Sequence, residues 1–412
     1  KLTVSRYWDF EPQVESPMTR DEAVDRLRDT LTDAVRIRMR SDVPLGSFLS
    51  GGIDSSLITA IAASQSDSPI RTFSMGFPIR DYDETAYAAE VAEHLKTQHQ
   101  RFEVQPRGVD IIDQLVWHYD EPFGDSSAVP TWYLSQQTRQ EVTVALAGDG
   151  GDELFAGYER YRALWLSSRL QRWFPIHRLP GIGLIQRLPD SNRRKSMVRR
   201  AKRFVEAIGQ TAARRYLNWL QIFPESLRAS LYTDDFVQQL PGDDPFDFLQ
   251  SAWDRSAGRD IVTRASISDL LTYLPCDLCT KVDVASMAHS LEVRQPMLDH
   301  RVVELAASMP VSHKFRGRRG KLILQDAFGS MIPKRIFTRD KMGFGIPIAH
   351  WFRDELRPMV HETLLAEDAR IRPFLRQEAV AQLVRSHENN EQNHGYRLWN
   401  LLILEKWLRR WT

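Results

Sequence analysis

The amino-acid sequence predicts an α/β protein built on a doubly wound parallel sheet, with a large helical C-terminal half. Short apolar, β-prone runs alternate with helical stretches over residues 19–162, which is the pattern of a parallel sheet covered by helices on both faces. After about residue 162 the strand signals fade and helical spacing dominates. The length of 412 residues is too great for one compact core, so two domains or more are expected.

The elements of the sheet region are expected in a regular order. Residues 19–40 are predicted to form a helix, because Thr19 and Glu22 have the spacing of a capping box and apolar residues follow at helical intervals. Strands are expected at residues 46–49, 70–75, 98–104 and 142–147. Helices are expected between them at residues 55–64, 84–95 and 109–119.

The chain divides into four expected segments. They are a linker at residues 1–18, an α/β domain at 19–162, a helical insertion at 163–260 and a helical C-terminal part at 261–412. Cys276 and Cys279 lie in the last segment and are interpreted as ordinary buried cysteines rather than half of a metal site.

The composition argues against several classes of partner. A net charge of +1 gives no general field for nucleic acid or acidic membranes, so neither is expected to bind. The strongest basic cluster, at residues 193–203, is interpreted as a solvated helix face rather than an RNA-binding surface. No apolar run reaches the length of a membrane span, and two cysteines cannot form a disulfide framework. These features predict a cytoplasmic protein.

A glycine- and serine-rich loop follows the first predicted strand and reads Ser50-Gly51-Gly52-Ile53-Asp54-Ser55-Ser56. Between a strand and a helix, backbone N–H groups and a helix N-terminus converge on an anion, and glycines let a phosphate approach the backbone. Asp54 would repel a phosphate unless a cation such as Mg²⁺ lies between them. The loop lacks the Walker A ending, and an ordinary Ser/Gly turn is the alternative interpretation.

A second glycine-rich loop, Gly148-Asp149-Gly150-Gly151-Asp152-Glu153, follows the strand predicted at 142–147. It occupies the same topological place as the first loop, where open α/β sheets bind their ligands. Three carboxylates among three glycines favour metal ligands and substrate contacts over a plain acidic turn. We therefore predict that the two loops lie side by side and bind a nucleotide triphosphate through a divalent cation.

These loops and several further segments resemble the PP-loop ATP pyrophosphatases, which have an adenine nucleotide alpha hydrolase-like fold. Within that group the chain looks like the synthetase domain of glutamine-hydrolysing asparagine synthetases. The first loop is shared by several PP-loop enzymes, and the combination with the other segments is specific. Those segments are Thr72-Phe73-Ser74-Met75-Gly76-Phe77, Asp120-Glu121-Pro122-Phe123, Gly157-Tyr158, Lys281-Val282-Asp283, Leu291-Glu292-Val293-Arg294-Gln295-Pro296-Met297-Leu298-Asp299, Gly320-Lys321 and Lys341-Met342-Gly343-Phe344.

The resemblance implies a two-step reaction. ATP would adenylylate the side-chain carboxylate of aspartate, and ammonia would then displace AMP to give asparagine. The resemblance implies Asp149 and Lys321 as catalytic residues, and Asp54 and Asp152 as Mg²⁺ ligands. It implies contacts with ATP or pyrophosphate from Leu49, Ser50, Gly51, Gly52, Asp54, Ser55, Ser56, Met75, Ala147 and Gly148.

Two departures from the family pattern keep alternatives open. Asp149 stands where related enzymes carry Glu, and the loop at residues 124–130 lacks the Arg that the bacterial enzymes have there. A related ligase with another acid, of the β-lactam synthetase, lasso-peptide cyclase or surface-sugar amidotransferase type, is therefore an alternative. A tRNA-modifying PP-loop protein and an inactive scaffold are the others.

The expected partners are small molecules, namely ATP, aspartate and ammonia from glutamine. The resemblance places the glutaminase in an N-terminal domain that this sequence does not include. Tyr7-Trp8 resembles the linker after that domain, and the first residue is Lys1 rather than Met. We therefore expect a fragment of a larger enzyme or a glutaminase on another chain, and a homodimer is left open.

Overall fold

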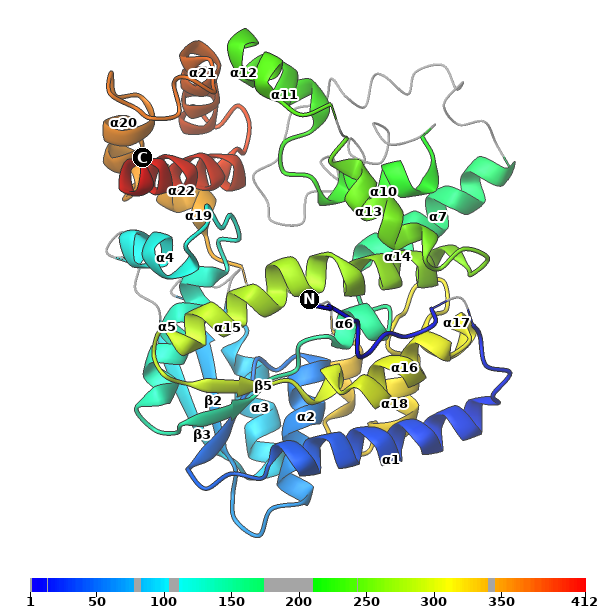
Figure 1. Ribbon diagram of the computed structural model, residues 1–412. Coiled ribbons are helices and arrows are strands. Elements are labelled where there is room, and N and C mark those ends of the chain that lie inside the picture. Colours follow the sequence, from blue (N-terminus) through cyan, green and yellow to red (C-terminus); the bar gives the residue numbers. More distant parts are fainter. Residues whose placement is uncertain are drawn as a thin grey trace.

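The protein is described by a computed structural model that covers residues 2–12, 14–77, 83–103, 111–173, 210–242, 244–339 and 345–412. Its centre is a parallel sheet of five strands in the order β3-β2-β1-β4-β5 (Figure 1). The strands are β1 (Leu45–Phe48), β2 (Arg71–Gly76), β3 (Gln98–Glu103), β4 (Val144–Leu146) and β5 (Glu292–Arg294). The first four agree with the predicted strands to within two residues.

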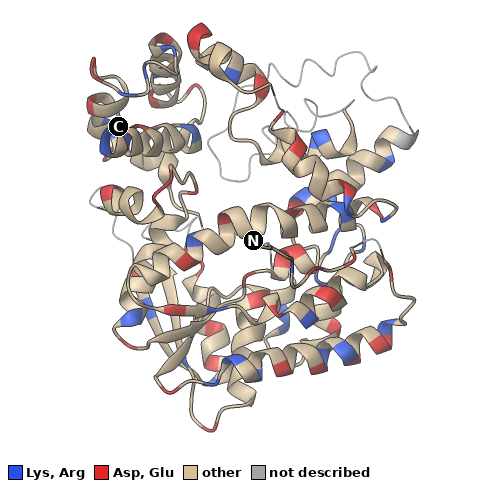
Figure 2. Cartoon of the chain, in the orientation of Figure 1, with Lys and Arg blue, Asp and Glu red and all other residues tan. Residues whose placement is uncertain are grey.

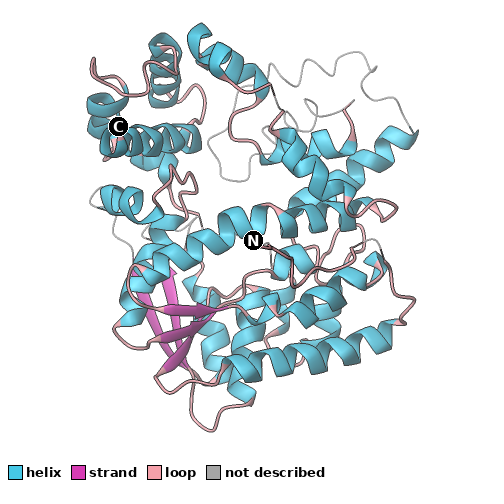
Figure 3. Cartoon of the chain, viewed as in Figure 1, coloured by secondary structure: helices cyan, strands magenta, loops and turns pink. Residues whose placement is uncertain are grey.

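Helices make up most of the remaining described chain, as Figure 3 shows. In the first part they are α1 (Arg20–Arg38), α2 (Ile53–Ser64), α3 (Thr85–Leu95), α4 (Ile112–Tyr119), α5 (Ala128–Arg139), α6 (Gly151–Leu154) and α7 (Glu159–Trp173). They continue with α10 (Ala212–Leu220), α11 (Glu225–Leu231), α12 (Asp234–Gln239), α13 (Phe246–Asp254), α14 (Ile261–Leu271) and α15 (Thr280–Met287). The last are α16 (His300–Ser308), α17 (Val311–Lys314), α18 (Leu322–Phe328), α19 (Ile348–Trp351), α20 (Arg357–Leu364), α21 (Gln377–Glu388) and α22 (Gly395–Trp411).

The sheet separates two hydrophobic cores because successive strand residues point to opposite faces. In β4, Ala145 belongs to the core formed with α4, α5, α15 and α22, whereas Leu146 belongs to the core formed with α1, α2, α3, α16 and α18. The doubly wound α/β prediction is therefore confirmed. The capping box of α1 is also present, since Glu22 N donates to Thr19 Oγ1 and Thr19 N donates to the Glu22 carboxylate at 2.8 Å.

Part of the helical half lies over the carboxyl ends of the strands, whereas α16 and α18 pack beside α1. The α14–α15 stretch crosses the molecule in Figure 1, with α19–α22 above the sheet on one side and α7, α10 and α13 on the other. A third core joins α7, α10, α13 and α14. Residues 261–412, which were expected to form a helical part, also contribute the strand β5, which pairs with β4 through Val144↔Glu292 and extends the sheet.

Two features of the sequence take a different place from the expected one. Residues 274–279 form a π-helix, and Cys276 in it is exposed while Cys279 is half-buried, so the interpretation of both as buried cysteines is wrong. The basic cluster at 193–203 lies outside the described residues. Elsewhere basic and acidic side chains are intermixed, as along α1 in Figure 2, where Arg28 pairs with Asp25. Among the described helices, none is long and apolar enough to cross a membrane.

Candidate active site

The two predicted loops meet because of the strand order. From β1 the chain proceeds to β2 and β3 on one side and then returns to β4 on the other side of β1. The order reverses between β1 and β4, where Gly46 pairs with Ala145 and Ser47 with Leu146. Both strands point the same way, so the loops that follow them leave the sheet side by side. This is the switch point at which open α/β sheets bind ligands.

Glycines allow the two loops to touch. A Cβ atom on Gly148 would lie 2.6 Å from the backbone nitrogen of Ser55, and one on Gly151 would lie 2.4 Å from Cγ of Asp54. Both distances are too short for any side chain. The prediction that the loops lie side by side is therefore confirmed, and it depends on glycine at these two positions.

Lys321 forms ion pairs with one carboxylate from each loop, those of Asp54 and Asp152. Its Nζ lies 2.5 Å from Oδ2 of Asp54 and 2.7 Å from Oδ1 of Asp152, and its side chain is 7% exposed. Burial opposes the charged form of Lys321, but the charges of Asp152 and Asp54 outweigh burial and raise its pKa. A Cβ on Gly157 would lie 2.3 Å from Cε of Lys321, so glycine there leaves room for the lysine.

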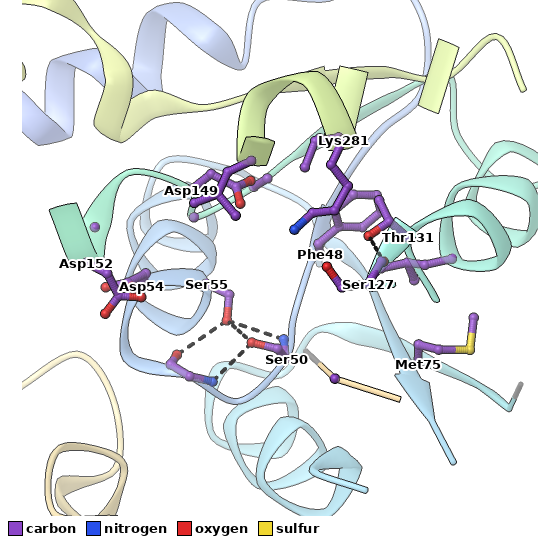
Figure 4. Close-up of a pocket in the computed structure, with 18 of the residues that line it drawn as sticks. Phe48, Ser50, Asp54, Ser55, Met75, Ser127, Thr131, Asp149, Asp152 and Lys281 are labelled. Carbon is purple, nitrogen blue, oxygen red and sulfur yellow. Dashed lines mark hydrogen bonds between the residues drawn. The ribbon is translucent and has the colours of Figure 1, made fainter. Parts of the chain in front are cut away.

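Hydroxyl groups arrange the first loop around the start of α2. Ser50 Oγ lies 3.0 Å from Ser55 Oγ, and Gly52 N donates to Ser50 Oγ at 3.3 Å (Figure 4). Gly51 has a φ of 71° and packs against α3, where a Cβ would lie 2.5 Å from Ala88 N. Of the predicted loop residues, Gly51 and Ser56 do not reach the cavity wall, and Ser56 is fully buried.

A cavity of about 490 Å³ opens beside this loop pair, which is a typical size for a small-molecule site. Its apolar part is lined by Phe48, Phe73 and Leu134, with Met75 close by. Most of the predicted site residues line it, namely Leu49, Ser50, Gly52, Asp54, Ser55, Met75, Ala147, Gly148, Asp149 and Asp152. Lys321 reaches the site through its two ion pairs.

The donor set at Asp54 and Asp152 fits Mg²⁺. The ammonium of Lys321 contacts both carboxylates at once, which shows that they can share one cation. Among the described residues, no three or more His, Cys, Asp or Glu side chains gather in a metal-binding group. A site with two carboxylates suits Mg²⁺, which is commonly bound through one or two carboxylates together with substrate phosphates.

Asp149 lies in the wall of the cavity, between the Asp54–Asp152 pair and Lys281 (Figure 4). Burial raises the pKa of its carboxyl group, while the charge of Lys281 opposes that rise. A carboxyl group whose pKa is raised in this way is able to accept a proton nearer neutral pH than an exposed one.

An ion pair that sequence reasoning missed occupies the other end of the cavity. Lys281 Nζ donates to Asp125 Oδ2 at 2.9 Å, and both residues line the cavity. The two residues are 156 positions apart in the sequence. The available signals were a segment with an isolated lysine, Lys281-Val282-Asp283, and a loop without arginine at residues 124–130.

Comparison with known proteins identifies relatives along nearly the whole chain. A family profile described as asparagine synthase matches residues 26–409. The glutamine-hydrolysing asparagine synthetase 1 of Bacillus subtilis is 32% identical over 396 residues, which cover 94% of this chain and 59% of the relative. Asparagine synthetase 3 of the same organism is 26% identical over 363 residues, covering 82% of this chain and 51% of the relative.

A further relative carries a different description. The amidase chyE of Penicillium rubens is 26% identical over 431 residues, covering 95% of this chain and 63% of the relative. The chain thus spans between 51% and 63% of the length of these relatives. Since the family profile extends over most of its residues, the chain belongs to the asparagine synthase family.

Proposed function

We propose that this chain is the synthetase part of an asparagine synthetase, which adenylylates the side-chain carboxylate of aspartate and amidates it with ammonia. The observation that carries the proposal is the meeting of Asp54, Asp152 and Lys321 at the switch point of the sheet, beside a cavity. Family membership supports ATP-dependent amide formation as the class of reaction. The ammonia would come from glutamine through a glutaminase domain or a separate glutaminase chain.

The first step activates the carboxylate. A carboxylate oxygen bonds to the α-phosphorus of ATP, and the bond from that phosphorus to the leaving pyrophosphate breaks. Ser50, Ser55 and the N-terminus of α2 offer donors to the pyrophosphate, and Lys321 offsets charge that gathers on the phosphates. Mg²⁺ held by Asp54 and Asp152 would supply further charge neutralisation. Leu49, Met75, Ala147 and Gly148 are assigned to the adenosine part.

The second step forms the amide. The nitrogen of ammonia bonds to the acyl carbon, and the carbon–oxygen bond to AMP breaks with its electron pair leaving on AMP. The nitrogen must also lose a proton. Asp149 lines the cavity and has a raised pKa, so we assign it as the group that accepts this proton.

One observation favours a second candidate, a ligase of the same mechanism with another acid. Residues 124–130 present Asp125 in an ion pair with Lys281 where related enzymes are expected to carry Arg. The site would therefore recognise its acid through different groups. The reacting end, with Asp54, Asp152 and Lys321, is common to both candidates.

Measuring the products with a panel of acids separates the candidates. The purified chain is incubated with ATP, Mg²⁺, ammonium and one acid, and AMP and pyrophosphate are quantified. We expect release that requires aspartate, with asparagine formed in equal amount. Release of AMP and pyrophosphate with another acid, and none with aspartate, would favour the second candidate. ADP and phosphate as products would contradict both.

A further inference from the structure

A second buried cation lies in the cavity, at the end away from Lys321. Lys281 belongs to α15, directly after the π-helix Leu274–Cys279, and its side chain is 10% exposed. Figure 4 shows its amine pointing into the cavity between Asp149 and Ser127. Among the described residues, Lys281 thus lines the cavity, while Lys321 is engaged by the carboxylates of Asp54 and Asp152 at the phosphate end of the site.

Asp125 is a fixed support for Lys281. Its Oδ1 accepts from Ser127 N at 2.9 Å, and its Oδ2 accepts from Ser127 Oγ at 2.6 Å and from Lys281 Nζ at 2.9 Å. Burial and the charge of Asp125 raise the pKa of the neighbouring Asp277 to about 7, so Asp277 competes less for the lysine than an ordinary carboxylate would. Its hydrogen bonds with Ser127 and Lys281 leave Asp125 little capacity to bind a ligand itself.

Lys281 keeps donors for a ligand. A lysine ammonium has three N–H donors, and in the described part of the chain Asp125 takes one of them. A buried ammonium with unfilled donors is costly unless an anion or another acceptor completes them. The neighbouring cavity is the space from which such an anion would come.

We propose that Lys281 binds the second carboxylate of the acid substrate, the one that is not adenylylated, and so selects a dicarboxylic amino acid. The inference rests on the proposed function, because the reacting carboxylate must face the ATP phosphates near Asp54 and Lys321. The other carboxylate then extends toward the far end of the cavity, where Lys281 is the buried cation. A site built around such a contact rejects acids that lack it by about 100-fold or more.

The test compares aspartate with β-alanine, which keeps the reacting carboxylate and the amine but lacks the second carboxylate. Pyrophosphate release is measured with Mg-ATP and ammonium for the wild-type chain, Lys281→Met and Asp125→Asn/Lys281→Met. In the wild type we expect kcat/KM for aspartate to exceed that for β-alanine by about 100-fold or more. In both variants this ratio should fall below about 10, with the KM for ATP within about threefold of wild type. The double variant is included because Lys281→Met leaves the Asp125 carboxylate without its lysine partner, and Asp125→Asn removes that charge.

Lys406→Met is the matched control, because Lys406 pairs with Asp113 on the surface, away from the cavity. Its ratio should equal that of the wild type. Stabilisation by Mg-ATP in a thermal unfolding assay verifies that each variant is folded. If the ratio of kcat/KM for aspartate to that for β-alanine is unchanged in the double variant, the role of Lys281 is overturned. An equal loss of kcat/KM for both acids, together with a raised KM for ATP, would also overturn it. A wild-type chain that is silent with aspartate would instead overturn the proposed function, and this inference with it.

Discussion

Replacing Lys321 with methionine should lower the free energy of unfolding. Mg²⁺ without ATP should then stabilise the variant more than it stabilises the wild type. The variant removes the cation that Asp54 and Asp152 share, and these carboxylate side chains are only 17% and 13% exposed. Removing one partner of a buried ion pair costs about 3–5 kcal/mol, and the open cavity lets water reach both carboxylates. We therefore expect a loss of about 3 kcal/mol, at the lower end of that range.

Mg²⁺ should recover part of this loss by binding the two carboxylates. At a free concentration ten times the dissociation constant, one bound ion adds about 1.4 kcal/mol. The assay is urea unfolding followed by tryptophan fluorescence, with and without Mg²⁺ and without ATP. Wild type should respond less, because its lysine already neutralises the site.

Lys314→Met is the control for this experiment. Lys314 is also buried, but its Nζ donates to the backbone oxygen of Ala306 at 2.7 Å rather than to a carboxylate. This variant should lose stability without gaining a response to Mg²⁺. The reasoning would be refuted if Lys321→Met unfolds at the wild-type urea concentration and Mg²⁺ changes nothing.

Three further predictions follow from the same structure. Asp54→Ala or Asp152→Ala should abolish pyrophosphate release while far-UV circular dichroism stays that of a folded protein; activity in both would refute the metal assignment. Gly148→Ala should reduce that activity by about 100-fold or more, because its Cβ would lie 2.6 Å from Ser55 N, and wild-type activity would contradict the close contact. Burial lowers the pKa of His387 from 6.5 to about 4, so its contribution is complete above pH 6.5 and is lost as pH falls toward 4. About 2 kcal/mol should be lost by pH 5 in thermal unfolding, and His387→Gln should flatten this dependence.

Much of the sheet was predictable because its strands carry local signals. Apolar runs followed by glycine-rich loops marked β1 and β4, and the strand order that makes these two strands neighbours brings their loops together. β5 was missed because Glu292-Val293-Arg294 has one apolar residue and its strand geometry comes from pairing with the edge of β4. Such a strand is specified by its neighbour rather than by its own sequence.

The candidate site divides in the same way. Asp54 and Asp152 could be chosen from the sequence because each lies in a glycine-rich segment that comes after a predicted strand. Lys321 was identified through the family resemblance, since as a residue it lies in a basic run; its partners depend on the packing of α18 against the sheet. The Asp125–Lys281 pair needs α15 to cross the cavity, and no local pattern encodes a contact over that separation.

The proposed reaction depends on direct transfer of AMP to a carboxylate at the site formed by the two loops. The most direct measurement uses aspartate labelled with ¹⁸O in its side-chain carboxylate, with ATP, Mg²⁺ and ammonium, followed by mass spectrometry of the products. Adenylylation predicts that AMP acquires one labelled oxygen, because the carboxylate oxygen bonded to phosphorus leaves with AMP. Label in inorganic phosphate, or AMP without label while asparagine forms, would contradict the account.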